Sequence, residues 1–212
     1  MSSPATAETI APGFSSRRQY DLTIPAPEGD KHCSVRFPTD EEWCQRARQQ
    51  TAIRRTLGRD ATRTEVKGDT DTAKELFDKI VIGDEPGIDE YEALQIVTML
   101  GRCEIFNVTR EGGCYGIEMK VPGASVKHRL KIPTQRQIFE HGRSALHVTG
   151  RRNSVEIKSA LEPSGELWDK IVDSVSGYRD GGPVPIIHKD VALTELLAQI
   201  SAEIEAGVSP EA

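Results

Sequence analysis

The sequence predicts an α+β protein of two tandem, related units, each a β-hairpin or small antiparallel sheet packed by about three α-helices. Three pairs of similar segments carry this prediction. They are ELFDKI (75–80) with ELWDKI (166–171), VRFPTDEEW (35–43) with LKIPTQRQI (130–138), and YDLTIP (20–25) with GIEMKVP (116–122). Each pair shows the same alternation of apolar and polar residues, so the similarity extends to the predicted structure.

The separation between matched residues is nearly constant. It is 97 residues for Pro25 and Pro122, 95 for Pro38 and Pro133, 91 for Leu76 and Leu167, and 100 for Leu100 and Ile200 if the last helices are aligned. The changes fall in segments that read as loops, where a duplicated fold tolerates insertions. We therefore expect unit 1 over residues 16–101 and unit 2 over 102–206, with flexible tails at 1–15 and 207–212.

Each unit is expected to begin with a hairpin whose strands alternate in polarity and end at a proline, which cannot continue a strand ladder. A helix follows in each unit. Thr39 with Glu42, and Thr134 with Gln137, have the spacing of a capping box, in which side chain and backbone bond each other reciprocally. The first of these helices is predicted to span about Asp40 to Leu57, with Gly58 as its stop.

Two further helices are expected in each unit. In unit 1 they carry Leu76, Phe77 and Ile80, and then the stretch that starts at Asp89. In unit 2 the corresponding segments contain Leu167, Trp168, Ile171, Val191, Leu193, Leu196, Leu197 and Ile200. Between the units, CEIFNVT (103–109) is predicted to add a strand beside 115–121 through a turn at Gly112 and Gly113. That turn keeps Cys103 far from Cys114, so free thiols are expected.

Charge is unevenly distributed in a chain whose net charge is −6. Residues 43–67 hold seven basic and two acidic side chains, a local charge of +5, and residues 69–104 hold ten acidic and three basic ones, a local charge of −7. Arg48, Arg55 and Arg59 would form one stripe on the first predicted helix and are the candidate interaction face. The stripe could bind phosphate, or it could be a solvated surface that pairs with acidic helices.

The sequence offers no candidate catalytic, cofactor-binding or metal-binding residues. The five histidines form no i, i+4 pair, no C-x-x-C occurs, and the glycine cluster near Cys114 lacks the Lys-Ser/Thr of a phosphate loop. We therefore expect no cofactor and no enzymatic activity. The N-terminus shows neither a basic segment nor an apolar core of a signal peptide, and no run of about 18 apolar residues is present. A cytoplasmic protein without membrane contact is expected.

The segment VRFPTDEEWCQRARQQTAIRRTLGR (35–59) resembles tail-assembly chaperones encoded in phage tail operons. The resemblance lies in a hairpin that enters an acidic and then basic helix, followed by mostly helical sequence. It implies a role in virion assembly in the host cytoplasm, with tape-measure or tail-tube proteins as partners and no chemistry.

These observations predict a non-enzymatic assembly or adaptor protein. A repeated surface suits an elongated or oligomeric partner because it raises the effective concentration of the second contact. Adjacent patches of opposite charge also suit association between copies, so a homo-oligomer is a second possible assembly. The alternative is a regulatory nucleic-acid-binding protein that uses the basic helix face, although the acidic net charge makes nucleic acid the less favoured partner.

Overall fold

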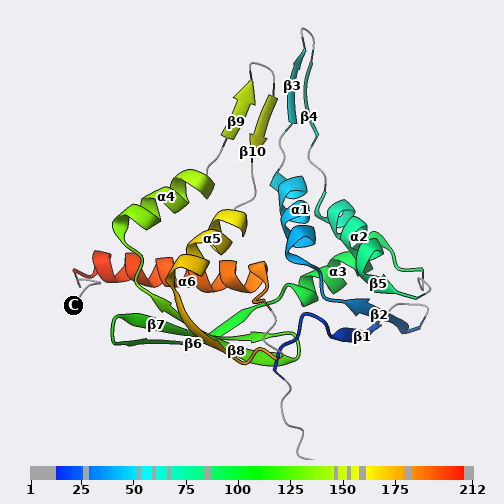
Figure 1. The fold of residues 1–212 in the computed structure, drawn as a ribbon. Coiled ribbons are helices and arrows are strands. Elements are labelled where there is room, and N and C mark those ends of the chain that lie inside the picture. The colour runs from blue at the N-terminus through cyan, green and yellow to red at the C-terminus, as the bar shows by residue number, and fades with distance from the viewer. Residues whose placement is uncertain are drawn as a thin grey trace, which may run out of the picture.

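The computed structural model describes residues 13–25, 29–51, 54–58, 61–65, 68–83, 87–145, 148–151, 154–157, 161–179 and 183–207. Six helices and several antiparallel sheets make up these residues, which confirms the predicted α+β class. Figure 1 shows the larger sheets on one side of the molecule, the helices packed over them, and two narrow hairpins projecting from the opposite side. None of the described helices combines the length and the apolar character needed to span a membrane.

The first half of the chain forms a three-stranded sheet with three helices. In chain order its elements are β1 (Gln19–Ile24), β2 (Lys31–Arg36), α1 (Asp40–Thr51), β3 (Arg54–Gly58), β4 (Ala61–Glu65), α2 (Asp69–Ile80), β5 (Val81–Ile82) and α3 (Glu90–Leu100). The sheet order is β1-β2-β5, because β5 leaves α2 directly and pairs antiparallel with β2. The strands β3 and β4 pair only with each other.

The second half begins with an additional strand, β6 (Glu104–Glu111). It continues with β7 (Cys114–Val121), β8 (Ala124–Lys131), α4 (Gln135–Ala145), β9 (Val148–Arg151), β10 (Ser154–Ile157), α5 (Leu161–Ile171), β11 (Val172–Ser176) and α6 (Ile186–Glu205). Its sheet order is β11-β8-β7-β6, while β9 and β10 form a separate hairpin. From β7 onward, the elements follow one another and pair in the same order as in the first half.

Two local predictions are confirmed in detail. The backbone N–H of Thr39 donates to Glu42 Oε2 at 2.8 Å, and the N–H of Glu42 donates back to Thr39 Oγ1 at 3.3 Å. Thr134 and Gln137 form the same capping box with the same two distances. These reciprocal bonds satisfy amide groups that the first helical turn leaves open, so both helices start where the sequence placed them.

The predicted turn after β6 is also confirmed. Glu111 pairs with Cys114 across Gly112 and Gly113, which both have positive φ, a conformation that glycine adopts without a steric penalty. Cys103 and Cys114 consequently lie at opposite ends of the hairpin, and all four cysteines are free thiols.

The helix predicted over Asp40–Leu57 is wrong in its second part. α1 ends at Thr51, and Arg54–Gly58 form the strand β3 instead. The residues 54–65 include three threonines, and β-branched residues favour strands over helices. The apolar positions Ile53 and Leu57 fitted a helical period, but they also fit a short strand, an ambiguity that a few residues cannot resolve.

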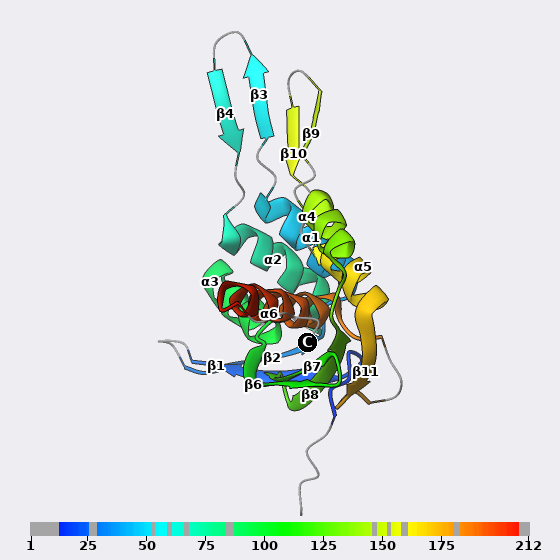
Figure 2. The ribbon, with the colours of Figure 1, turned by 90° about the vertical axis from the view of Figure 1, so that its left-hand side faces the viewer.

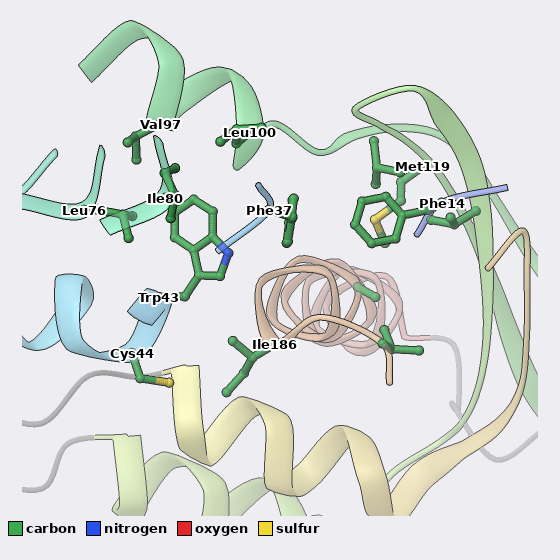
Figure 3. Packing of buried hydrophobic residues seen from close by; sticks show 14 of the residues in the cluster. Phe14, Phe37, Trp43, Cys44, Leu76, Ile80, Val97, Leu100, Met119 and Ile186 are labelled. Atoms are coloured by element: carbon green, nitrogen blue, oxygen red, sulfur yellow. The ribbon is translucent and has the colours of Figure 1, made fainter. Parts of the chain in front are cut away.

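A single hydrophobic cluster runs through both halves. It joins buried side chains of α1, α2 and α3 to those of β7, β8, α5 and α6. Figure 3 shows Trp43 beside Ile80 on one side of α6, with Phe14 and Met119 on the other. Because the two halves share this cluster, each one lacks part of its core without the other.

A charged contact ties three elements of the first half together. Arg36 donates from two nitrogens to the carboxylate of Glu42, at 2.8 and 2.6 Å, and also to the backbone oxygen of Lys79 at 3.0 Å. The contact therefore links β2, the start of α1 and the end of α2. Hydrogen bonds from Arg36 and Thr39 lower the pKa of Glu42 to about 2. In the second half the matched positions hold Lys131 and Gln137, which cannot form such an ion pair.

Replacing Glu42 with Gln should preserve the capping box and remove the ion pair, as in the second half. We expect the free energy of unfolding at pH 7 to fall by about 1–2 kcal/mol, a modest value because Arg36 is half-exposed. The stabilisation is present above the unfolded pKa of about 4.5 and is lost as pH falls toward 2. Urea unfolding at pH 7 measures it, with the exposed Glu41→Gln as the control. Equal stability of the two variants would show that the ion pair of Arg36 and Glu42 does not stabilise the protein.

Candidate functional site

Two hairpins extend away from the body of the molecule and lie next to each other. Arm 1 is the hairpin β3–β4 between α1 and α2, and arm 2 is the hairpin β9–β10 between α4 and α5. Figures 1 and 2 show both arms projecting from the same end of the molecule. β3 of arm 1 contacts β10 of arm 2, so the two halves of the chain contribute to one paired structure.

The helices beneath the arms are tied by polar contacts. Arg46 on α1 lies 2.5 Å from the carboxylate of Asp69 at the start of α2, and Gln50 donates to the same carboxylate. These contacts join the end of α1 to the start of α2 at the base of arm 1. An ion pair between Arg48 on α1 and Glu162 on α5 links the base of arm 1 to that of arm 2.

The arms are the basic part of an acidic molecule. Residues 52–67 and 146–160, which contain the arms and their connections, hold eight of the 27 Lys and Arg residues and three of the 33 Asp and Glu residues. Their charge is therefore +5, and the remaining chain carries −11. The basic residues of the sequence are thus concentrated in the two segments that contain the arms, and such a separation of charge can guide a contact electrostatically.

The structure places Arg48 and Arg55 of the predicted interaction face on different elements. Arg48 lies on α1 and is ion-paired with Glu162, Arg55 lies on β3, and Arg59 falls outside the described residues. The idea of one helical stripe is thus wrong, since the helix ends before Arg55. The arrangement instead associates the basic residues that follow Thr51 with the arm.

A chain of buried polar rings lies at the junction of the two halves. The indole Nε1 of Trp168 donates to Nδ1 of His128 at 3.1 Å, and Nε2 of His128 lies 2.6 Å from the hydroxyl of Tyr178. That hydroxyl lies 3.2 Å from Nδ1 of His188. Both histidines are completely buried. The four residues come from α5, β8, the segment after β11, and α6.

The direction of every hydrogen bond in this chain follows from Trp168, because an indole N–H can only donate. Nδ1 of His128 must accept, so the proton of that neutral ring is on Nε2 and is donated to Tyr178. The Tyr178 hydroxyl then donates to Nδ1 of His188, which puts the remaining proton on Nε2 of His188. This last N–H is buried and has no hydrogen-bond partner among the described residues.

The surroundings keep these hydrogen-bonded rings uncharged at neutral pH. Burial, with a smaller contribution from the charge of Lys189, lowers the pKa of His128 to about 4. Burial and the neighbouring His128 lower the pKa of His188 to about 3, and burial raises the pKa of the Tyr178 hydroxyl. The nearby thiol of Cys103 has a pKa raised to about 12 by burial and by Asp190, so it is also uncharged at neutral pH.

His188 also holds the N-terminal segment against the junction. The ring centroids of Phe14 and His188 are 4.6 Å apart at an edge-on angle of 67°, and Phe14 packs on Phe37 at 5.0 Å. The backbone of Phe14 bonds to both sides of Tyr178, with its N–H to Gly177 and its oxygen to Arg179. The N–H of Ile186 at the start of α6 donates to Asp40 at the start of α1, at 2.8 Å. The polar chain therefore belongs to the joint between the halves.

Sequence reasoning did not identify these hydrogen-bonded rings, because bonded partners are separated by 10 to 50 positions and match no motif. The one available signal was composition. His128 falls on the inward face of an alternating strand, and histidine at such a position requires a hydrogen-bond partner. The described residues contain no cluster of three or more His, Cys, Asp or Glu side chains that could hold a metal ion.

The comparisons with known proteins found no match to this chain. No protein-family model, no curated protein and no solved structure matches it.

Replacing Tyr178 with Phe should destabilise the protein strongly. The variant leaves the N–H of His128 and the acceptor nitrogen of His188 buried without partners, and each such group costs about 1–3 kcal/mol. We expect a loss of about 3 kcal/mol in the free energy of unfolding by urea at pH 7.5. Tyr91, which is 69% exposed, provides the matched control in Tyr91→Phe, where the change should be close to zero. An equally small effect of Tyr178→Phe would contradict the proposed hydrogen bonds of Tyr178 to His128 and His188.

Stability should also fall on mild acidification. The pKa of each buried histidine is lowered from about 6.5, so the unfolded chain binds more protons than the folded one below that pH. Stability present above pH 6.5 is lost as pH falls toward 4 for His128 and toward 3 for His188. At about 1.4 kcal/mol per pKa unit, each histidine should remove about 2 kcal/mol between pH 7.5 and pH 5. Urea unfolding at both pH values tests this. The control variant His32→Gln, at an exposed position, should lose the same amount of stability between the two pH values.

Proposed function

We propose that the chain is a non-enzymatic assembly or adaptor protein and that the paired arms are the end that binds a macromolecular partner. The supporting observation is that each half inserts a hairpin at the same place in its order of elements, and that both hairpins project side by side. The helices at the base of arm 1 are joined by the ion pair of Arg46 and Asp69, so a partner bound at the arms would meet a connected base.

We propose further that the two halves arose by duplication of one unit. With Val35 and Leu130 as matched residues, strand pairing gives Tyr20 opposite Val35 and Tyr115 opposite Leu130. Val81 and Val172 then pair with the same two positions from the other side. The offset between the hairpins is thus 95 residues in both strands. On this register Pro25 and Pro122 are not equivalent, because the first hairpin has a longer connection.

The narrower assignment to phage tail assembly, with tape-measure or tail-tube proteins as partners, rests on the resemblance of residues 35–59 alone. The α1 segment of that resemblance ends at Thr51, and the basic residues beyond it belong to arm 1. A partner in this proposal therefore meets a β-hairpin rather than a basic helix. Localisation in the cytoplasm and the absence of catalysis remain predictions from the sequence.

A photocrosslinking amino acid placed in an arm should capture the partner in the cells that encode this protein. We expect adducts of increased mass with the probe at Thr62 in β4 or Thr149 in β9, and none with the probe at Ser125 in β8, which is exposed on the sheet. Replacing residues 52–67 with a short Gly-Ser linker should abolish adduct formation from Thr149 and retain cooperative thermal unfolding. The proposal is wrong if both arm positions give only uncrosslinked chain.

A further inference from the structure

We propose that this chain associates head to tail with a second copy of itself, through α4 of one copy and the α2–α3 end of the next. The inference goes beyond the proposed function but rests on the duplication proposed with it, because it matches positions between the two halves. Three observations carry it: the contact that covers α1 inside the chain, the exposure of the matching face of α4, and the charges on the two faces that would meet.

Inside the chain, α1 of the first half is covered by helices of the second half. α1 contacts both α5 and α6, and the N–H of Ile186 at the start of α6 donates to Asp40 at the start of α1. Further along α1, Arg48 forms an ion pair with Glu162 on α5. Cys44, one helical turn before Arg48, is only 4% exposed, and Figure 3 shows its side chain pointing toward α5. The junction thus shows what covers a helix at this position of a unit.

α4 is the matching helix of the second half, and its equivalent face is exposed. The capping boxes at Thr39 and Thr134 fix the match between α1 and α4 at an offset of 95 residues. Phe139 therefore corresponds to Cys44, yet the Phe139 side chain is 66% exposed. Among the described elements, α4 packs mainly on α5, as α1 packs on α2. The contact that α1 receives from the other half has no counterpart at α4 within the described part of the chain.

The exposed ring indicates that this side of α4 is an interaction surface rather than a terminal face. In proteins built from repeated units, the last unit normally has a polar outer face that keeps it soluble. Here the outer side of α4 carries Phe139, with the guanidinium of Arg143 over its ring at 5.9 Å from the ring centroid. Aromatic residues and arginine are enriched at protein interfaces. This pair therefore suits a protein partner.

The match between the halves also identifies what would cover α4. By the alignment of ELFDKI (75–80) with ELWDKI (166–171) and by the order of elements, α2 and α3 correspond to α5 and α6. Figure 1 shows the helices in the order α4, α5, α1 and α2 across the molecule. A second copy placed beside α4 as the second half is placed beside α1 would present its α2 and α3. This placement repeats a contact that the chain already makes internally.

The charges on the two faces are complementary. Arg143 on α4 corresponds to Arg48, and Asp71 on α2 corresponds to Glu162. The ion pair between the halves therefore has a matching arginine at one end of the molecule and a matching carboxylate at the other, and both are exposed. On α3, Tyr91 is 69% exposed and adds an aromatic ring to the second face. Because the two faces differ, the contact is heterologous, and successive copies form a chain or close into a ring.

Sedimentation velocity of the purified full-length chain, from micromolar to submillimolar concentration, tests the proposal. The α4 variant is Phe139→Ser with Arg143→Ser, and the α2–α3 variant is Asp71→Ser with Tyr91→Ser. We expect the wild-type chain to associate beyond two copies as its concentration rises. Each variant should weaken this association about tenfold or more, because a few aromatic and arginine side chains supply most of the binding energy of an interface.

Mixing the α4 variant with the α2–α3 variant in equal amounts distinguishes a head-to-tail contact from a symmetric one. Each variant retains the face that the other lacks, so we expect complexes of two chains that do not grow further. A contact between two identical faces would not give this result. The matched control is Phe106→Ser with Lys120→Ser on β6 and β7, which removes another exposed ring and the cation over it. This control should associate as the wild-type chain does.

A charge exchange separates loss of the contact from loss of folding. Arg143→Asp or Asp71→Arg alone should weaken association, and the two changes together in one chain should restore it, which a misfolded chain could not do. The proposal is overturned by a wild-type chain that stays at 23.3 kDa throughout, by an equal loss in the control, or by a mixture without two-chain complexes. A different protein as the partner of α4 would leave the purified chain monomeric and also overturns it. Crosslinking from the arms uses neither face, so it decides the proposed function separately.

Discussion

The desolvated junction between the two halves is the constraint on which the rest of the structure depends. α6 lies at this junction, where His188 packs against Phe14 and Phe37 from the first half and hydrogen-bonds Tyr178 from the second. Rings that carry polar atoms can be buried here only because they remain neutral and their hydrogen bonds run in one direction, beginning at the donor-only indole of Trp168. The packing of α1 and α5 around this junction brings the bases of the arms together.

The two halves place different side chains at corresponding positions. When the matched segments are aligned, Cys33 and Phe77 stand in the first half where His128 and Trp168 stand in the second. The first half therefore has two buried apolar side chains where the second has the start of the polar chain. Conversely, the ion pair of Arg36 and Glu42 has no charged counterpart at Lys131 and Gln137. Under the proposed duplication, each copy retained the backbone arrangement and changed the polar contacts that stabilise it.

A division of labour follows from the charge distribution. The described residues of the body form a core shared by both halves, and the sequence segments that contain the arms carry a charge of +5 against −11 for the rest of the chain. Binding residues often concentrate on segments that project from a rigid scaffold.

The sequence by itself determined the features governed by local interactions. The two capping boxes, the Gly112–Gly113 turn, the free thiols and the α+β class all follow from residues close together in the chain or from simple periodicity. It did not determine the arms, because residues 52–65 satisfy helix and strand patterns equally until pairing partners are known. The hydrogen-bonded rings from Trp168 to His188 and the contact between β3 and β10 were decided only by tertiary structure. Both depend on contacts between distant segments, whose closeness is set by burial of the shared core.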